Sequence, residues 1–200
     1  MTYIHGLVVL SAIISIGGAI LYMRDTLRGK TKPNLISWSM WAIAPLIGTG
    51  AAIFAHADIW ATVRIFLAGF IPLLVVIFSL TNKQSYWKLT FFDGLCGAFS
   101  LIALGLWLIV DLPQLAILFA VIGDGFAALP TIIKSWKNPE TETGMTYIAS
   151  FISVVIVLPS IPVWDIPNSA FQIYLLIINI ILVSLVYRKY ILCKLGFIIR

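Results

Sequence analysis

Seven long apolar runs follow one another along this chain, and short connections separate them. A segment of about 20 apolar residues crosses a hydrocarbon core roughly 30 Å thick. Because each run is close to that length, the sequence predicts an all-α integral membrane protein with seven transmembrane helices. The runs span residues 4–23, 35–54, 59–80, 89–110, 115–133, 145–162 and 169–187.

The positive charges of the chain follow a second pattern. Lys and Arg residues lie in the connections after the first, third and fifth runs and in the tail after the seventh, and only Arg64 departs from this arrangement. The other three connections contain Asp and His residues but no Lys or Arg. Because cytoplasmic connections of membrane proteins are enriched in Lys and Arg, the N-terminus is predicted outside and the C-terminus in the cytoplasm.

The composition limits what else the chain can contain. With 61% hydrophobic and 10% charged residues, it has too little polar sequence for a separate soluble domain. The formal net charge of +5 is explained by orientation and by attraction to anionic lipid headgroups, so the lipid bilayer, not nucleic acid, is the expected partner. Short connections and an isoleucine-rich interior favour a prokaryotic plasma membrane. Whether the protein acts alone or as a homodimer stays open.

Two connections resemble each other in place and content, which indicates an internal repeat. Residues 28–34 read RGKTKPN after the first run, and residues 134–140 read KSWKNPE after the fifth. The repeat predicts a three-helix bundle over residues 1–82, a linker helix over residues 83–112, and a second three-helix bundle over residues 113–200. Two consecutive bundles of three helices would be antiparallel, but the single linker helix between them reverses the chain once more. The two bundles are therefore predicted to be parallel and related by an axis along the membrane normal.

The second of these connections resembles the PQ-loop motif. Residues 129–131 (LPT) precede a basic stretch that ends at Lys137, and residues 139–146 (PETETGMT) lead into the next apolar run. In the PQ-loop family a Pro-Gln pair precedes a basic turn and a Ser-Thr-x-Gly-x-Ser-like start of the following helix. Thr131 stands in place of the Gln, and residues 21–22 (LY) occupy the corresponding place in the first half.

The PQ-loop family includes the SWEET sugar facilitators and the lysosomal exporters of cystine and cationic amino acids. The resemblance implies their arrangement of three, one and three helices with the N-terminus outside. It also implies a transported small polar solute, such as a sugar, an amino acid or a vitamin-like compound. The same fold occurs in a cargo-retrieval receptor, so fold alone does not select a ligand.

Asp124 lies near the middle of the fifth run, between two glycines. A carboxylate at that depth costs on the order of 3 kcal/mol to insert, so it is expected to face a bundle interior or a wet cavity. This is the chemistry of a proton-coupling and substrate-binding site, and the glycines allow a helix or ligand to approach. The structural alternative is a hydrogen bond to a neighbouring helix.

Two further residues in the apolar runs are candidates for the same site. Asn179, near the middle of the seventh run, lies at the depth where transporters of this family place a substrate-binding asparagine, although asparagine also joins helices. Trp41 is placed either to line a cavity or to pack in the interior. Trp38, one turn nearer the predicted cytoplasmic side, is expected to anchor that interface.

Prolines interrupt several of the predicted helices. Pro45 and Pro130 lie inside the second and fifth runs, where each removes a backbone hydrogen bond and permits bending. We expect them to act as hinges for gating. The alternative is that they have no such role, since proline is frequent in membrane helices.

An enzyme is not expected. Asp93 and Asp124 lie on consecutive runs and suggest an intramembrane aspartyl protease as a remote alternative, but their predicted depths differ, and Asp93 is expected to be structural. The two cysteines show no metal-ligand spacing, and His5 and His56 lie near the outer surface, so neither metal nor cofactor is predicted. The sequence therefore predicts an alternating-access transporter, with a non-transporting receptor or assembly factor of the same fold as the alternative.

Overall fold

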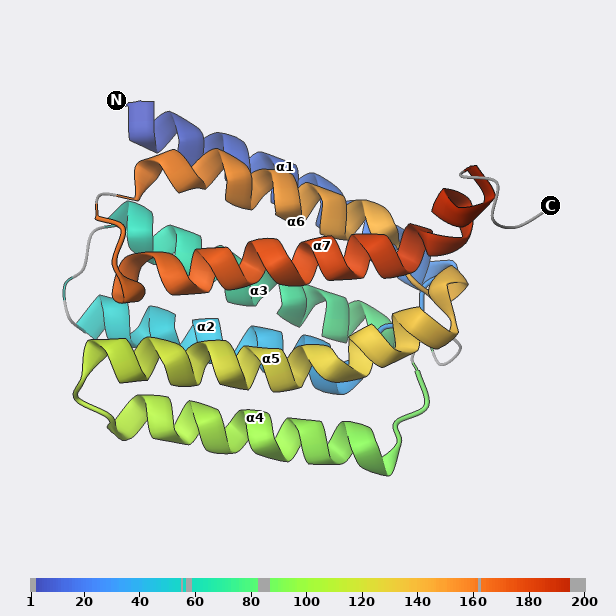
Figure 1. The fold of residues 1–200 in the computed structure, drawn as a ribbon, viewed down its shortest axis with the longest axis horizontal. Coiled ribbons are helices and arrows are strands. Elements are labelled where there is room, and N and C mark those ends of the chain that lie inside the picture. Colours follow the sequence, from blue (N-terminus) through green and yellow to red (C-terminus); the bar gives the residue numbers. More distant parts are fainter. Residues whose placement is uncertain (1–2, 55, 57–58, 83–86, 162, 195–200) are drawn as a thin grey trace.

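A computed structural model describes residues 3–54, 56, 59–82, 87–161 and 163–194, and in that part the chain contains helices and no strand. Each predicted apolar run falls on one α-helix, and the helices run side by side (Figure 1). The α-helices are α1 (Tyr3–Leu27), α2 (Leu35–Phe54), α3 (Ile59–Thr81), α4 (Phe91–Ile109), α5 (Pro113–Lys137), α6 (Gly144–Val157) and α7 (Ile166–Lys194), and two 3-10 turns, η1 (Pro139–Thr141) and η2 (Leu158–Ser160), flank α6.

The lengths of the apolar stretches support a helical membrane protein. Four helices, α1, α4, α5 and α7, are long and apolar enough to cross a membrane. In α2, α3 and α6 the apolar stretches of the described residues are shorter, at Leu35–Gly50, Ile65–Thr81 and Gly144–Ser160. The prediction of transmembrane helices is therefore confirmed for the four long ones.

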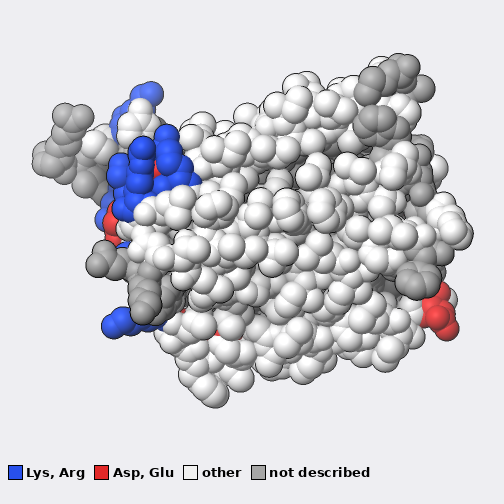
Figure 2. Space-filling model, turned by 180° about the vertical axis from the view of Figure 1, so that it is seen from behind, with Lys and Arg blue, Asp and Glu red and all other residues white. Residues whose placement is uncertain are grey.

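The charged side chains are distributed unevenly along the helix axes. Figure 2 shows Lys and Arg gathered at one end of the molecule, while the long face between the two ends is almost free of charge. Arg24 lies in the last turn of α1, Lys134 and Lys137 in that of α5, and Lys194 in that of α7. We call this the basic end, and the first and fifth connections both lie there.

Each helix has defined neighbours. α3 packs against both α1 and α2, and α7 packs against both α5 and α6. The two sets of three meet twice, through α1 with α6 and through α2 with α5. α4 lies at the edge of the molecule, where its main neighbour is α5 and a smaller contact reaches α2 (Figure 1).

Glycines let α1 and α6 approach closely. A Cβ atom added to Gly18 would lie 2.5 Å from the Cβ of Ala149 and 3.3 Å from the Cα of Thr146, whereas one added to Gly17 would meet nothing within 4 Å. Thr146 also donates a hydrogen bond of 2.5 Å to the carbonyl oxygen of Gly18. In a membrane no hydrophobic effect drives helices together, so they associate through close van der Waals packing, which small residues at such positions allow.

Gly18→Ala is therefore expected to lower the free energy of unfolding by about 1–3 kcal/mol, because overpacking forces α1 away from α6. Gly17→Ala, one residue earlier on the same helix, is the matched control and is expected to be neutral or stabilising. Unfolding of both variants in mixed micelles by titration with sodium dodecyl sulfate measures the difference. Equal stabilities of the two variants would contradict the packing described for Gly18.

The start of α4 is tied to the start of α2 by buried polar groups. Thr90 and Asp93 form a capping box at the N-terminus of α4, and Asp93 also accepts a hydrogen bond of 3.2 Å from the Nδ2 of Asn34. The Oδ1 of Asn34 accepts from the backbone N–H groups of Ile36 and Ser37, which cap α2. Asp93 therefore has structural hydrogen-bond partners, Thr90 and Asn34, in keeping with the structural role expected of it.

Replacing Asn34 by alanine is expected to destabilise the protein by about 1–3 kcal/mol, because it removes the cap of α2 and leaves a buried carboxylate with one donor fewer. Asn138→Ala serves as the control, since the side chain of Asn138 makes only an exposed hydrogen bond to Glu140. Thermal unfolding of the two purified variants in detergent compares them. A melting temperature for Asn34→Ala as high as that for Asn138→Ala would refute this role.

Candidate functional site

Asp124 contacts aromatic residues from two other helices. The hydroxyl of Tyr174 on α7 donates a hydrogen bond of 2.5 Å to Oδ2 of Asp124 on α5. The indole of Trp41 on α2 also faces this carboxylate without completing a regular hydrogen bond to it. We call these three residues the central cluster. The structure thus brings together Asp124 and Trp41, two of the residues predicted to form the site.

Trp41 contacts all three buried apolar groups described in the interior. It packs against a buried group that includes Ala128 and Tyr147, against a second that includes Tyr22, and against a third that includes Ala127. Its ring also meets that of Trp38 edge-on, with 5.3 Å between the centroids and an interplanar angle of 80°. The indole of Trp41 therefore both lines the central cluster and packs between the two sets of three helices.

The other predicted residues have local partners. Asn179 is buried, and its Nδ2 donates a hydrogen bond of 2.7 Å to the carbonyl oxygen of Leu175, one turn earlier on α7. Pro45 and Pro130 both lie inside helices. Pro45 has no N–H group to offer the carbonyl of Trp41 four residues earlier, so the interruption of α2 occurs at the central cluster. Substrate binding by Asn179 and bending at the prolines stay predictions.

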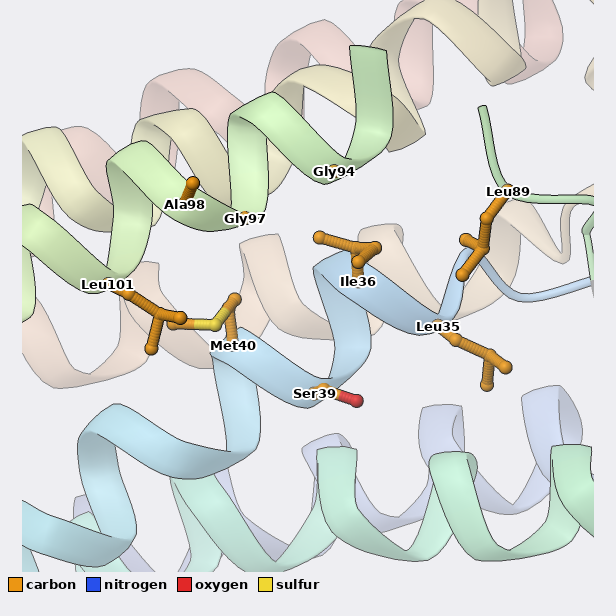
Figure 3. Close-up of a pocket in the computed structure, with 9 residues that line it drawn as sticks. All are labelled: Leu35, Ile36, Ser39, Met40, Leu89, Gly94, Gly97, Ala98 and Leu101. Carbon is orange, nitrogen blue, oxygen red and sulfur yellow. The ribbon is translucent and has the colours of Figure 1, made fainter. Parts of the chain in front are cut away.

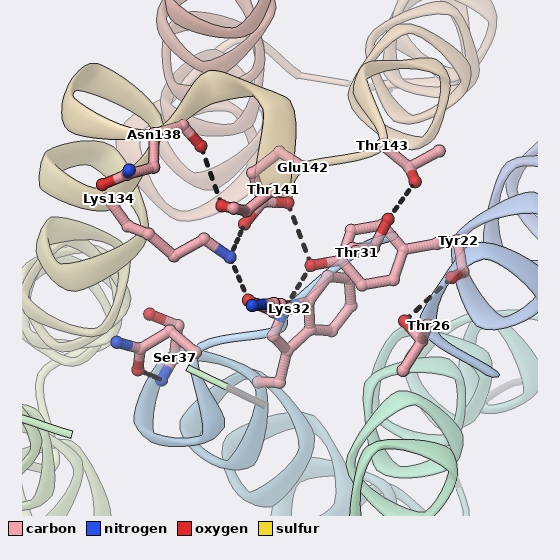
Figure 4. A network of polar contacts seen from close by, with 12 residues as sticks. Tyr22, Thr26, Thr31, Lys32, Ser37, Lys134, Asn138, Thr141, Glu142 and Thr143 are labelled. Carbon is pink, nitrogen blue, oxygen red and sulfur yellow. Dashed lines mark hydrogen bonds and ion pairs between the residues drawn. The ribbon is translucent and has the colours of Figure 1, made fainter. Parts of the chain in front are cut away.

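A second polar group lies buried at the basic end (Figure 4). Nζ of Lys134 in the last turns of α5 lies 2.5 Å from Oε1 of Glu142, which follows η1, and the two side chains are 1% and 0% exposed. Lys134 also donates to the backbone carbonyl of Lys32 and lies 5.7 Å from the ring centre of Trp87. Buried charges of this kind persist only when they are paired and hydrogen-bonded.

Two tyrosines complete the surroundings of the Glu142 carboxylate. The hydroxyls of Tyr22 on α1 and Tyr147 on α6 each donate a hydrogen bond of 2.9 Å to its Oε2. Nε1 of Trp38 on α2 donates one of 3.1 Å to the oxygen of Tyr22. We call Tyr22, Trp38, Lys134, Glu142 and Tyr147 the basic-end network. Trp38 is buried inside it, so its predicted position as an exposed interface anchor is wrong.

The first and fifth connections are bonded to each other beside this network. The backbone N–H of Lys32 donates to the carbonyl of Thr141 at 2.9 Å, and the hydroxyls of Thr31 and Thr143 are 2.5 Å apart. Thr143 also donates a hydrogen bond of 3.1 Å to Asp25. Together with the basic-end network, these contacts join the two sets of three helices at that end.

The sequence analysis missed the basic-end network. In the sequence, Lys134 is one of several basic residues of a connection, and Glu142 is part of the PQ-loop-like stretch. The available signal was two carboxylates in a connection that also contains Lys134 and Lys137, of which Glu140 is exposed and Glu142 is buried. The pKa of Glu140 lies below its ordinary value because its own backbone N–H donates to the carboxylate, and Asn138, Lys189 and Arg188 add to this effect.

An apolar groove between α2 and α4 is separate from both polar groups. It has a volume of about 440 Å³ and is lined by Ile36 and Met40 of α2 and by Leu101 and the glycines of α4 (Figure 3). Its lining offers one hydroxyl, that of Ser39, and no charged side chain. The groove therefore suits acyl chains better than a polar solute.

No metal centre is present among the residues that the structure describes, because no three His, Cys, Asp or Glu side chains lie together there. Cys96 is buried, Cys193 is partly exposed, and both are free thiols. The carboxylates of Asp93 and Asp124 have separate hydrogen-bond partners. Comparison of the chain with protein-family models, with curated proteins and with solved structures gave no match.

Proposed function

We propose that this protein is a SWEET-like, seven-helix transporter of the PQ-loop type that moves a small polar solute across a prokaryotic plasma membrane. In this proposal, two parallel three-helix bundles expose a central site alternately to either side, with α4 as the linker and the basic end in the cytoplasm. Asp124 binds the solute and couples its movement to protons. Whether two copies associate does not alter this scheme.

The pattern of helix contacts supports the two bundles. When α1, α2 and α3 are exchanged for α5, α6 and α7, the contacts of α3 with α1 and α2 become those of α7 with α5 and α6. The same exchange turns the contact of α1 with α6 into that of α5 with α2. This symmetry is expected of parallel repeats related by an axis along the membrane normal.

The central cluster is the observation that carries the proposal. It places one carboxylate within a membrane-spanning segment, faced by a phenol and an indole from two other helices. Ionisable groups at such depth are expensive, and they mark substrate and proton pathways. The three side chains come from both bundles, so a relative motion of the bundles changes the surroundings of Asp124.

The basic-end network supports alternating exposure. An alternating-access protein needs a barrier that closes one side while the other is open. Here four helices and the first and fifth connections meet around the Glu142 carboxylate, which closes that end with an ion pair and hydrogen bonds. These contacts join the bundles, so they must separate when the site opens to the basic end.

Transport by purified protein in liposomes tests the proposal. Vesicles that contain the protein and a trapped pH indicator are given an inward proton gradient and labelled pools of sugars, amino acids and vitamins. Uptake of one pool above that of protein-free vesicles, with acidification of the lumen, is expected. Absence of both uptake and counterflow for every pool would reject transport, and saturable binding without flux would instead favour the receptor alternative.

A further inference from the structure

Two buried hydroxyls on α5 lack a protein partner. Thr131 and Ser135 are both 0% exposed, and neither Oγ atom has a hydrogen-bond partner among the described residues. They are four residues apart and lie on one face of the helix. Asp124 belongs to the same stripe, seven residues before Thr131. At 1.5 Å per residue, the stripe runs about 16 Å from Asp124 to Ser135, towards the basic end.

The helix that packs against α5 contributes a matching pair. Ser37 is 0% exposed, and within the described part of the chain neither its Oγ nor the Nε1 of Trp41, one turn later, completes a hydrogen bond. α2 and α5 are in contact, and Trp41 packs against the buried group of Ala128. Figure 4 shows Ser37 at the start of α2 beside the basic-end network. We call Ser37, Trp41, Thr131 and Ser135 the α2–α5 seam.

The energetics of this arrangement point to a ligand that can both donate and accept hydrogen bonds. A buried polar atom without a partner costs about 1–3 kcal/mol. Buried hydroxyls elsewhere in the chain bond to a carbonyl of their own helix, as Ser11 does to Val8 and Thr49 does to Pro45. Three hydroxyls and one indole N–H on one seam, with Asp124 at its inner end, form a row of positions that water can satisfy.

We propose that the α2–α5 seam binds a file of water molecules that carries protons between Asp124 and the basic end. This water file deepens the proposed function and rests on it, because the file is the route by which the coupled proton reaches Asp124. A hydrogen-bonded file passes a proton by successive transfer, so the carboxylate can exchange protons without a passage wide enough for the solute. Lys134, three residues from Thr131, lies at the outer end of the file.

Silver-ion accessibility of single cysteines tests the seam directly. Ser135→Cys and Thr131→Cys are introduced separately into a Cys193→Ser background, and the purified proteins in detergent are exposed to silver nitrate in chloride-free buffer. Ag⁺ is a small cation that travels with water, and it replaces the thiol proton. The thiols that have not reacted with Ag⁺ are then counted by maleimide labelling after denaturation and by mass spectrometry.

The chain supplies its own controls. Cys96 is buried on α4 away from the seam, and Ile122 is exposed on the outer side of α5 near its middle. We expect the thiols at positions 131 and 135 to react at least about tenfold faster than Cys96 and Ile122→Cys, because thiolates form only where water reaches them. Rates at both positions as slow as that of Cys96 would overturn the proposal.

This experiment needs no solute, so its result is independent of the liposome assay. If one cysteine variant fails to fold, the other still decides the question. Reactive seam positions in a protein that shows no flux would reject the proposed transport and retain the water file. Unreactive positions in a protein that transports would reject the water file alone.

Discussion

Glu142→Gln is expected to lower the free energy of unfolding by about 3–5 kcal/mol, because it leaves the ammonium of Lys134 buried without its counter-charge. The side chains of this ion pair are almost inaccessible to water. The hydroxyls of Tyr22 and Tyr147 remain able to donate to the amide oxygen, so the loss reports the charge and not the hydrogen bonds. Titration with sodium dodecyl sulfate in mixed micelles measures the change.

Two comparisons separate the loss of the buried ion pair from a general effect of removing a carboxylate at the basic end. Glu140→Gln is the matched control, since Glu140 lies 4.0 Å from Lys189 in an ion pair whose side chains are 68% and 60% exposed, and a change below about 1 kcal/mol is expected. Lys134→Met combined with Glu142→Gln removes both charges and should recover most of the stability. A single Glu142→Gln variant as stable as Glu140→Gln would show that the buried pair does not hold the basic end together.

Asp124→Asn is expected to reduce proton-driven uptake to the level of protein-free vesicles while it raises the stability of the protein by about 1–3 kcal/mol. The gain follows from removing a carboxylate whose insertion costs on the order of 3 kcal/mol, since the amide oxygen still accepts the hydrogen bond from Tyr174. The loss of proton-driven uptake follows because the asparagine amide neither binds nor releases a proton at the pH of the assay. A gain in stability at the expense of activity is typical of functional residues.

Asp111→Asn is the control for this prediction, because Asp111 lies exposed in the connection between α4 and α5. It should leave both uptake and stability unchanged. Liposome flux and unfolding in mixed micelles are measured on the same preparations of the three proteins. If Asp124→Asn destabilised the protein and retained full proton-driven uptake, Asp124 would be a structural hydrogen-bond acceptor and the coupling role would be lost.

The helices of this fold were predictable because one physical requirement dominates them. A membrane allows only segments that bond their own backbone, so an apolar run specifies a helix without knowledge of its neighbours. The run predicted over residues 145–162 ends earlier as an α-helix, at Val157, and Pro159 lies in the following 3-10 turn η2. The helix neighbours are a different matter, because they depend on which faces pack together. The prediction of two bundles therefore came from a repeat and not from energetics.

The candidate site was predictable only where a single residue carries its own signal. Asp124 was recognisable because it is a charged residue in an apolar run, and that signal does not depend on knowing its partner. Tyr174, the partner, lies 50 residues away in the sequence and has nothing in its surroundings to distinguish it. Glu142 and Tyr22 are separated by 120 residues, and their contact depends on how α1 and α6 pack. Rotations of helices about their axes are set by that packing, which a linear pattern does not contain.

The carboxylate of Glu142 also sets an order of events during biosynthesis. Tyr22 and Trp38 are made and inserted long before the ribosome reaches Glu142, so the first three helices reach the membrane with an incomplete hydrogen-bonded core. Their polar groups find their acceptor only after α5 and the following turn have been synthesised. A chain truncated before that point leaves these polar side chains without their acceptor inside the bilayer, where no water replaces it.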